Sequence, residues 1–455
     1  MSGQEPLELA ERALGFADGE AQATVVRERS LLSRFAVSRP TQATEVDDLT
    51  VSVLRVHEGH TGSADTNETT DDALRDVAAR AGAAARAAAD AAGAPGDYPG
   101  LPAPAPARPT DGFDPLTAQL DPAVAGDALR IAFERCEAAG LQAFGIWTAG
   151  AVDTAIASST GVRALDAVTD AYMKVIARHE SGRSGWAAGA GRAIAALDPA
   201  ALAARAAGKV SREEPVDLAP GEYPVVLEHD AVGSLLDFLG ALAFNGLAHT
   251  EGRGALVGRL GQRVAASNIN LADSPRFART LPRAVDAEGV PKAPLPLIQD
   301  GVAHAVVHDT RSAARAGTTS TGHALVPGGS QYGPVPTNLV LIGGGAADEA
   351  ELMAPIEHGL YVTRLWYLNT VHQKSTLMTG TTRDGTFLIE DGRIGRPVKD
   401  VRFTDSILRL LEATEALTAT QRLVAEADFY GRRFASGVVT PALRAQGFRV
   451  TGQTL

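Results

Sequence analysis

The residues whose types and spacing are best suited to chemistry lie in Glu228-His229-Asp230, with Ser234 one helical turn further on. A histidine beside a carboxylate at the start of a helix, with a second ligand about one turn later, can hold a metal ion and a general base on one face. Here the second ligand position is Ser234, and a serine hydroxyl is a poor ligand for Zn²⁺. The stretch therefore has the spacing of a metallopeptidase helix without its full set of ligands.

Three roles remain open for His229. It can be a structural side chain, hydrogen-bonded at a packed domain junction. It can belong to a substitute metal site that combines His229 and Asp230 with a distant histidine, namely His249, His323 or His372. It can also contact a substrate.

Hydroxyl-rich segments offer hydrogen bonds of the kind that an extended peptide needs. Thr318, Ser320, Thr321 and His323 lie in one such segment, which is interpreted either as a peptide-binding loop or as a plain surface loop. Thr363 and Arg364 lie within the strand-like run 360–368, and a strand edge can hold a peptide by β-augmentation without demanding a particular sequence. These six residues are the candidates for a peptide groove.

The remaining motifs favour structural roles. His57 and His60 lie in a polar turn, where histidines are usually solvated rather than paired on a metal. The triple glycine at 343–345 lacks the Lys-Ser/Thr of a phosphate-binding loop. Cys136, the single cysteine, lies on an apolar helix face and is interpreted as a packed thiol. No serine occupies a Gly-x-Ser-x-Gly elbow, so a serine hydrolase is not supported.

Composition excludes several classes of partner. The 455 residues carry a net charge of −12, which argues against nucleic acid because phosphate binding needs a basic surface. No apolar run approaches the roughly 18 residues of a membrane span, and the first residues lack a signal-peptide pattern. We expect a cytoplasmic protein with no membrane association.

The elements that must position these residues divide into two parts. Residues 1–220 are expected to form an α+β domain with antiparallel strands and long helices, the longest over 71–92. The segment 93–115 is rich in proline, which predicts an extended, polyproline-like connector. The helix-then-strands order of 6–60 recurs after Asp121-Pro122, so a weak internal repeat is possible.

Residues 221–455 are expected to form a β-rich barrel- or sandwich-like domain. It opens with a buried strand that leads into a central helix over 228–245, where apolar residues recur at helical spacing. Asp300-Gly301 and Asp391-Gly392 predict hairpin turns. A helix from Ser406 to about Leu417 and a basic, less regular tail complete the prediction.

Several short motifs recur in the order found in one known family. They are Gly62-Ser63-Ala64-Asp65-Thr66-Asn67, Ser159-Thr160-Gly161-Val162-Arg163, Asp286-Ala287-Glu288-Gly289-Val290-Pro291, Pro336-Thr337-Asn338-Leu339-Val340-Leu341, Gly359-Leu360-Tyr361-Val362-Thr363-Arg364 and Phe387-Leu388-Ile389-Glu390-Asp391-Gly392-Arg393-Ile394. Each is weak alone, but their shared order spans more than three hundred residues. The chain resembles the TldD/PmbA (TldE) family along nearly its whole length.

The resemblance implies a two-subunit metallopeptidase that trims unfolded or leader-type peptides. Its TldD-type subunit carries zinc on a His-Glu-x-x-x-His helix, with a further cysteine ligand from the C-terminal domain. The motif falls on His229, Asp230 and Ser234, and no cysteine occurs near 397–402. The resemblance therefore implies a PmbA/TldE-type chain with no catalytic residue and no metal of its own, partnered by a zinc-bearing TldD-type subunit.

A second hypothesis belongs to another class. The chain would be a self-sufficient homodimeric enzyme with an unconventional metal site or with chemistry other than peptide hydrolysis. The absence of paired histidines and of a second cysteine favours the non-catalytic subunit.

Overall fold

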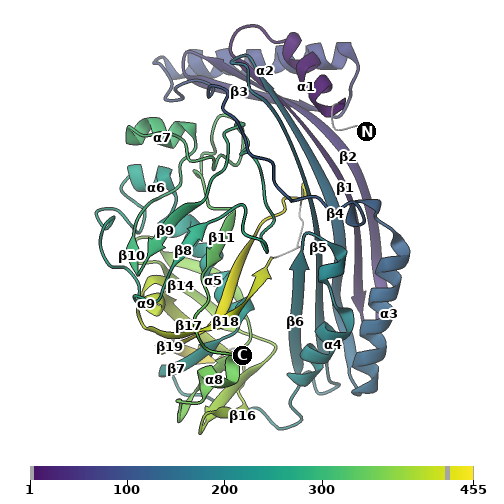
Figure 1. Cartoon of the computed structure of the whole chain (residues 1–455), viewed down its shortest axis with the longest axis vertical. Coiled ribbons are helices and arrows are strands. Elements are labelled where there is room, and N and C mark those ends of the chain that lie inside the picture. The colour runs from purple at the N-terminus through teal and green to yellow at the C-terminus, as the bar shows by residue number, and fades with distance from the viewer. Residues whose placement is uncertain (1–4, 426–430, 454–455) are drawn as a thin grey trace.

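The computed structural model describes residues 5–425 and 431–453, which form two domains that face one another (Figure 1). The N-terminal domain is built on one antiparallel sheet with the strand order β3-β2-β1-β4-β5-β6. Its strands are β1 Ala21–Ala36, β2 Arg39–His57, β3 His60–Thr66, β4 Gln142–Ser158, β5 Arg163–Arg178 and β6 Ser184–Gly191. Several of them are unusually long, so the sheet runs along most of the height of the molecule in Figure 1.

The N-terminal domain consists of two units with the same order of elements, helix, three strands, helix, as the weak repeat in the sequence suggested. The helices are α1 Glu5–Gly15 and α2 Asp71–Ala92 in the first unit, and α3 Pro122–Ala138 and α4 Pro199–Gly208 in the second. Local sequence sets their limits. Thr70, Asp121 and Asp198 cap α2, α3 and α4, and Gly93 ends α2 in the left-handed conformation.

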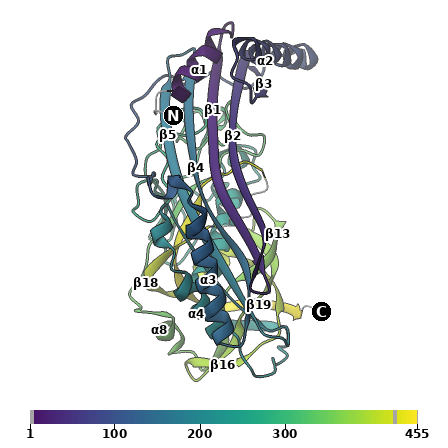
Figure 2. The same cartoon turned by 90° about the vertical axis from the view of Figure 1, so that its right-hand side faces the viewer.

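All four helices cover the same face of this sheet. Val25, Trp147 and Met173 point to that face, where α1 and α2 pack at one end and α3 and α4 at the other (Figure 2). Because side chains alternate along a strand, neighbours such as Thr24 and Thr148 point to the opposite, inner face. The inner face lies against the C-terminal domain, so both faces of the sheet are covered.

The C-terminal domain is a mixed sheet with helices at its margins. Its helices are α5 His229–Ala243, α6 Gly246–Thr250, α7 Thr310–Ala316, α8 Glu349–Met353 and α9 Ile407–Glu412. Its strands are β7 Gly221–Leu227, β8 Leu271–Asp273, β9 Leu295–Gln299, β10 Val302–Ala303, β11 Asn338–Leu341, β12 His358–Val362, β13 Leu365–His372, β14 Leu377–Thr382, β15 Thr386–Glu390, β16 Arg393–Pro397, β17 Val401–Ser406, β18 Thr414–Val424 and β19 Gly437–Gln453. The main path runs β10-β9-β8-β11-β19-β7-β12-β15-β16, and the sheet does not close into a barrel.

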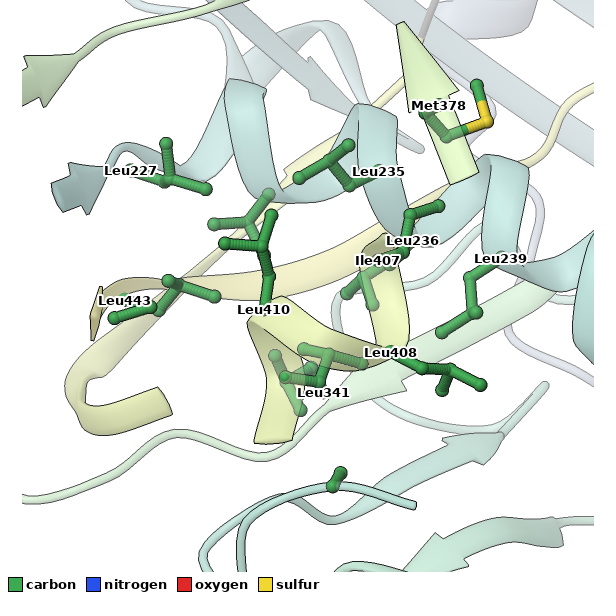
Figure 3. Packing of buried hydrophobic residues seen from close by; sticks show 14 of the residues in the cluster. Leu227, Leu235, Leu236, Leu239, Leu341, Met378, Ile407, Leu408, Leu410 and Leu443 are labelled. Atoms are coloured by element: carbon green, nitrogen blue, oxygen red, sulfur yellow. The ribbon is translucent and has the colours of Figure 1, made fainter. Parts of the chain in front are cut away.

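The central helix α5 lies at the heart of the C-terminal core. Leu235, Leu236 and Leu239 project from one side of α5 toward Leu410 and its neighbours on α9, as Figure 3 shows. At about 1.5–3 kcal/mol for each fully buried leucine, this stripe alone accounts for much of the driving force that seats the helix. The apolar spacing read from the sequence predicted this helix correctly.

The structure confirms the α+β class and both predicted Asp-Gly hairpin turns, at Asp300-Gly301 and Asp391-Gly392. The C-terminal domain is β-rich as expected, and its sheet does not close into a barrel. One expectation was wrong, because the expected irregular tail is instead β18 and β19. In this case Pro441 and Gly447 hide the strand pattern, because neither is typical of a strand interior.

Arg433 joins the two domains through the inner face of the N-terminal sheet. Its Nε and Nη2 donate to the two carboxylate oxygens of Asp170, both at 2.7 Å, and its Nη1 donates to Thr148 Oγ1 at 3.0 Å. Its backbone N–H donates to Glu28 at 2.8 Å. Gly150 makes room for the guanidinium, since a Cβ there would collide with Arg433 Nε.

A second ionic contact joins α4 of the N-terminal domain to the start of α5. Glu228 is 2% exposed, and its Oε2 accepts hydrogen bonds from Arg205 Nη2 at 2.8 Å and Lys209 Nζ at 2.7 Å. Tyr361 donates its hydroxyl to the other carboxylate oxygen. Burial opposes the charge, but Lys209 and Arg205 outweigh it and lower the pKa of Glu228 to about 2.

We expect Glu228→Gln to destabilise the fold by about 3–5 kcal/mol, because it leaves two buried cations without their counter-charge. The depressed pKa means that the carboxylate contributes its stability above the unfolded-state pKa of about 4.3 and loses it as the pH falls toward 2. Urea unfolding at a series of pH values measures both effects.

The matched control is Glu222→Gln, which breaks an exposed ion pair with Arg449 at 2.8 Å. It should change stability little, because solvent screens surface pairs. Two outcomes would contradict the role of the buried Glu228 ion cluster. One is an equal loss of unfolding free energy in the two variants, and the other is a Glu228→Gln variant that loses stability at acidic pH to the same extent as the unmodified chain.

Candidate functional site

His229 is the first residue of α5, and it faces protein groups rather than a shared metal position. Its side chain is 2% exposed, and its Nε2 lies 3.2 Å from the backbone oxygen of Thr420. A carbonyl oxygen only accepts, so Nε2 carries the proton and donates. Nδ1 lies 3.5 Å from Glu349 Oε1.

The electrostatic surroundings keep His229 neutral. Burial, followed by the positive charges of Arg422 and Arg205, lowers the pKa of His229 to about 4. With Nε2 donating to a carbonyl, only Nδ1 has a lone pair for a metal ion. These contacts favour the first of the three roles considered for His229, that of a hydrogen-bonded structural side chain.

The other two motif positions are not arranged as ligands either. Ser234 Oγ donates to the backbone oxygen of Asp230 at 2.9 Å, a bond back to the preceding turn of its own helix. The carboxylate of Asp230 faces Arg205, 3.7 Å away. Within 5–425 and 431–453, no three His, Cys, Asp or Glu side chains lie close enough together to hold a metal ion. The residues present therefore do not fit the zinc of the motif.

The distant histidines do not complete a substitute site in the described part of the chain. His323 is buried and pairs with Asp273, with His323 Nε2 3.0 Å from Asp273 Oδ2. His372 lies at the surface, where its Nδ1 is 2.8 Å from Ser375 Oγ. His249 lies in the short helix α6.

The first group of groove candidates is largely occupied by local hydrogen bonds. Ser320 Oγ and Thr321 Oγ1 donate to the backbone oxygen of His308, at 3.2 and 3.1 Å. Thr318 is exposed, while His323 lines a cavity between the domains. Their role in peptide binding stays a prediction.

The second group forms an internal contact. Thr363 Oγ1 donates to the backbone oxygen of Asp384 at 3.2 Å, and Arg364 Nε lies 3.3 Å from Asp384 Oδ2. The Arg364 guanidinium lies 3.9 Å from the ring centre of Trp186 and 4.9 Å from that of Trp366. Both side chains are buried, so a peptide would have to contact their surroundings rather than displace them.

A hollow beside α5 is the feature that the sequence did not reveal. It has a volume of about 430 Å³, and its lining includes Ser234, Asp237 and Phe238 of α5 together with Trp366 and Tyr367 of β13. Trp366 is 42% exposed and Tyr367 74% exposed, which is unusual for large aromatic side chains. The hollow places the motif helix beside an accessible, partly aromatic surface.

No local signal predicts this hollow, because its walls come from four separate stretches of the chain, 233–238, 365–368, 424–425 and 436–438. Only the pairing of β13 with β14 shows that Trp366 and Tyr367 reach the surface. None of the helices in the described ranges has the length and apolar character that crossing a bilayer requires.

Comparison with known proteins identifies relatives of both domains. Residues 220–452 match the PmbA/TldA metallopeptidase C-terminal domain, and residues 21–85 match PmbA/TldA metallopeptidase domain 1. A metalloprotease of Methanothermobacter thermautotrophicus is 27% identical over 206 residues, which cover 45% of this chain and 44% of the relative. A TldD homologue of Haemophilus influenzae is 25% identical over 244 residues, covering 52% of this chain and 48% of the relative. The matched region thus spans about half the length of these relatives.

Solved structures share the fold over the whole chain. TldE from Thermococcus kodakarensis superposes with a TM-score of 0.85 at 20% identity, covering 99% of this chain and 100% of that one. A protein described as a modulator of a DNA gyrase, from Thermotoga maritima, gives a TM-score of 0.84 at 18% identity and covers 98% and 99% of the two chains. At these identities the likeness is one of fold. The match over 220–452, more than half of the residues, shows that the chain belongs to the TldD/PmbA metallopeptidase family.

Proposed function

We propose that the chain is a PmbA/TldE-type, non-catalytic subunit of a TldD–TldE-like zinc metallopeptidase that processes or degrades unfolded or leader-type peptides. The observation that carries the proposal is the state of the motif helix. His229 is neutral and donates to the Thr420 carbonyl, and Ser234 donates back to its own helix. The zinc would come from a TldD-type partner.

The hollow beside α5 supplies what a non-catalytic subunit contributes. The exposed rings of Trp366 and Tyr367 offer apolar contact area that loses little conformational entropy on binding. The carboxylate of Asp237 lies at the same wall. This surface suits an unfolded segment, which presents side chains of varied type along an extended backbone.

Reconstitution with a TldD-type partner tests the proposal. We expect hydrolysis of an unfolded peptide only when both chains are present. Ser234→Ala in this chain should keep kcat/KM within about two-fold, because the side chain only bonds to its own helix. Replacing the first histidine of the partner's zinc motif should abolish activity. Hydrolysis by this chain alone would contradict the proposal and favour the self-sufficient homodimeric enzyme.

Tyr367→Asn tests the contribution of the hollow. Tyr367 has φ of 55°, a left-handed conformation that asparagine tolerates, so the backbone should be preserved. We expect kcat/KM of the reconstituted complex to fall by about ten-fold with an unchanged melting temperature, because an aromatic contact is lost. Tyr332→Asn is the control, since Tyr332 is 76% exposed and lies outside the hollow. Equal kcat/KM in the two variants would contradict a role of the hollow in binding the peptide.

A further inference from the structure

The cavity between the domains contains a group that the proposed function does not use. It has a volume of about 200 Å³ and lies between Thr24, Val26 and Val152 of the inner sheet face and the C-terminal residues near Arg283 and Phe434. A cavity of about 150 Å³ admits benzene. This cavity therefore has room for one apolar side chain together with a small polar group.

Most buried charges on the cavity wall have partners. Lys292 Nζ lies 3.4 Å from Asp273 Oδ2, and Arg433 makes the two-pronged contact with Asp170. The carboxylate of Asp286 accepts three backbone N–H groups at 2.9 Å each. These contacts hold the three groups in place, and Asp166, which also lines the cavity, accepts the backbone N–H of Ala284 at 3.2 Å.

Arg283 differs from them. Its Nε and Nη2 are buried, and neither has a hydrogen-bond acceptor among residues 5–425 and 431–453. The carboxylates of Asp166 and Asp170 act on Arg283 only as neighbouring charges, and burial lowers the pKa of its guanidinium. Leaving such donors buried without an acceptor costs free energy, which an incoming acceptor would recover.

The surroundings of Arg283 also fix its orientation. The ring of Phe434 lies 4.1 Å from the guanidinium carbon, so the planar group stacks on an aromatic face. Nε and Nη2 lie on one edge of the guanidinium, and their two N–H bonds run side by side. That pair matches the two oxygens of a carboxylate in a bidentate contact.

We infer that this cavity binds the C-terminal carboxylate of a peptide whose last residue is apolar. Arg283 holds the carboxylate through Nε and Nη2, and the last side chain lies against Val26 and Val152. A phosphate would present more oxygens than the two free donors can satisfy. That the carboxylate belongs to a peptide rests on the proposed function, whereas the recognition of a carboxylate follows from Arg283 itself.

Calorimetric titration of the full chain with N-acetyl-Ala-Leu tests the inference, and its C-terminal amide serves as the matched ligand. The free acid should bind at least about ten-fold more tightly than the amide, because only the acid offers two anionic oxygens to the guanidinium. Isovalerate, a free carboxylic acid of similar side-chain shape, should bind more weakly than the peptide acid.

Arg283→Met should abolish the preference for the acid without lowering the melting temperature, since it removes an unpaired buried charge. Arg279→Met is the control, because Arg279 lies one turn of chain away, exposed and outside the cavity, and should keep the preference. Equal binding of acid and amide by the unmodified chain would overturn the inference, and isovalerate binding as tightly as the peptide would overturn its assignment to peptides. Neither of these two results would affect zinc-dependent hydrolysis by the reconstituted complex. The binding inference and the proposed function can therefore be contradicted independently.

Discussion

The buried carboxylate of Glu228 is the interaction on which the arrangement of the molecule depends. It sits at the last position before α5 and ties that position to Arg205 and Lys209 beyond the domain boundary. A buried charge of this kind must be matched, because removing either partner leaves an uncompensated ion in a low-dielectric interior. These contacts therefore fix the orientation of the start of α5 relative to α4. Because His229 is the next residue, they also fix its position.

The same ion cluster, together with apolar packing, holds the motif helix α5 in place. The apolar stripe of α5 packs on α9, and Gly233 lets the helix approach β18 so closely that a Cβ there would lie 2.6 Å from Val424 Cβ. Neither contact needs a metal ion. Because packing and the ion cluster hold the helix, its position does not depend on the side chains at 230 and 234. Asp230 and Ser234 both contact other groups of the protein.

The sheet of the N-terminal domain acts as a wall with two different faces. Its outer face packs against helices in the ordinary apolar way, whereas its inner face buries polar side chains that meet the C-terminal domain. Arg433 matches this polar face and Gly150 makes room for it. The cavity around Arg283 is the part of that junction where polar groups are not fully matched.

Local signals in the sequence predicted a good share of the fold. Capping residues such as Asp121 and Asp198 and the Asp-Gly turns act over a few residues, so they can be read directly. The full length of the strand β1 is not evident from the sequence, because a sheet covered on both faces does not show clean alternation of polar and apolar residues. The serine at position 234, a poor ligand for Zn²⁺, can also be read directly from the sequence. The ion cluster at Glu228 cannot, because its members come from distant segments, with Tyr361 lying 133 residues from Glu228, and only the fold brings them together.

The most direct test of the central claim is the metal content of this chain, measured by mass spectrometry on the protein purified alone and again with a co-expressed TldD-type partner. The account predicts no stoichiometric zinc on the chain alone and about one zinc per heterodimer, because a tetrahedral site needs three or four suitable ligands and His229 already donates to a carbonyl. About one zinc per chain on the protein alone, removed by His229→Ala, would contradict it.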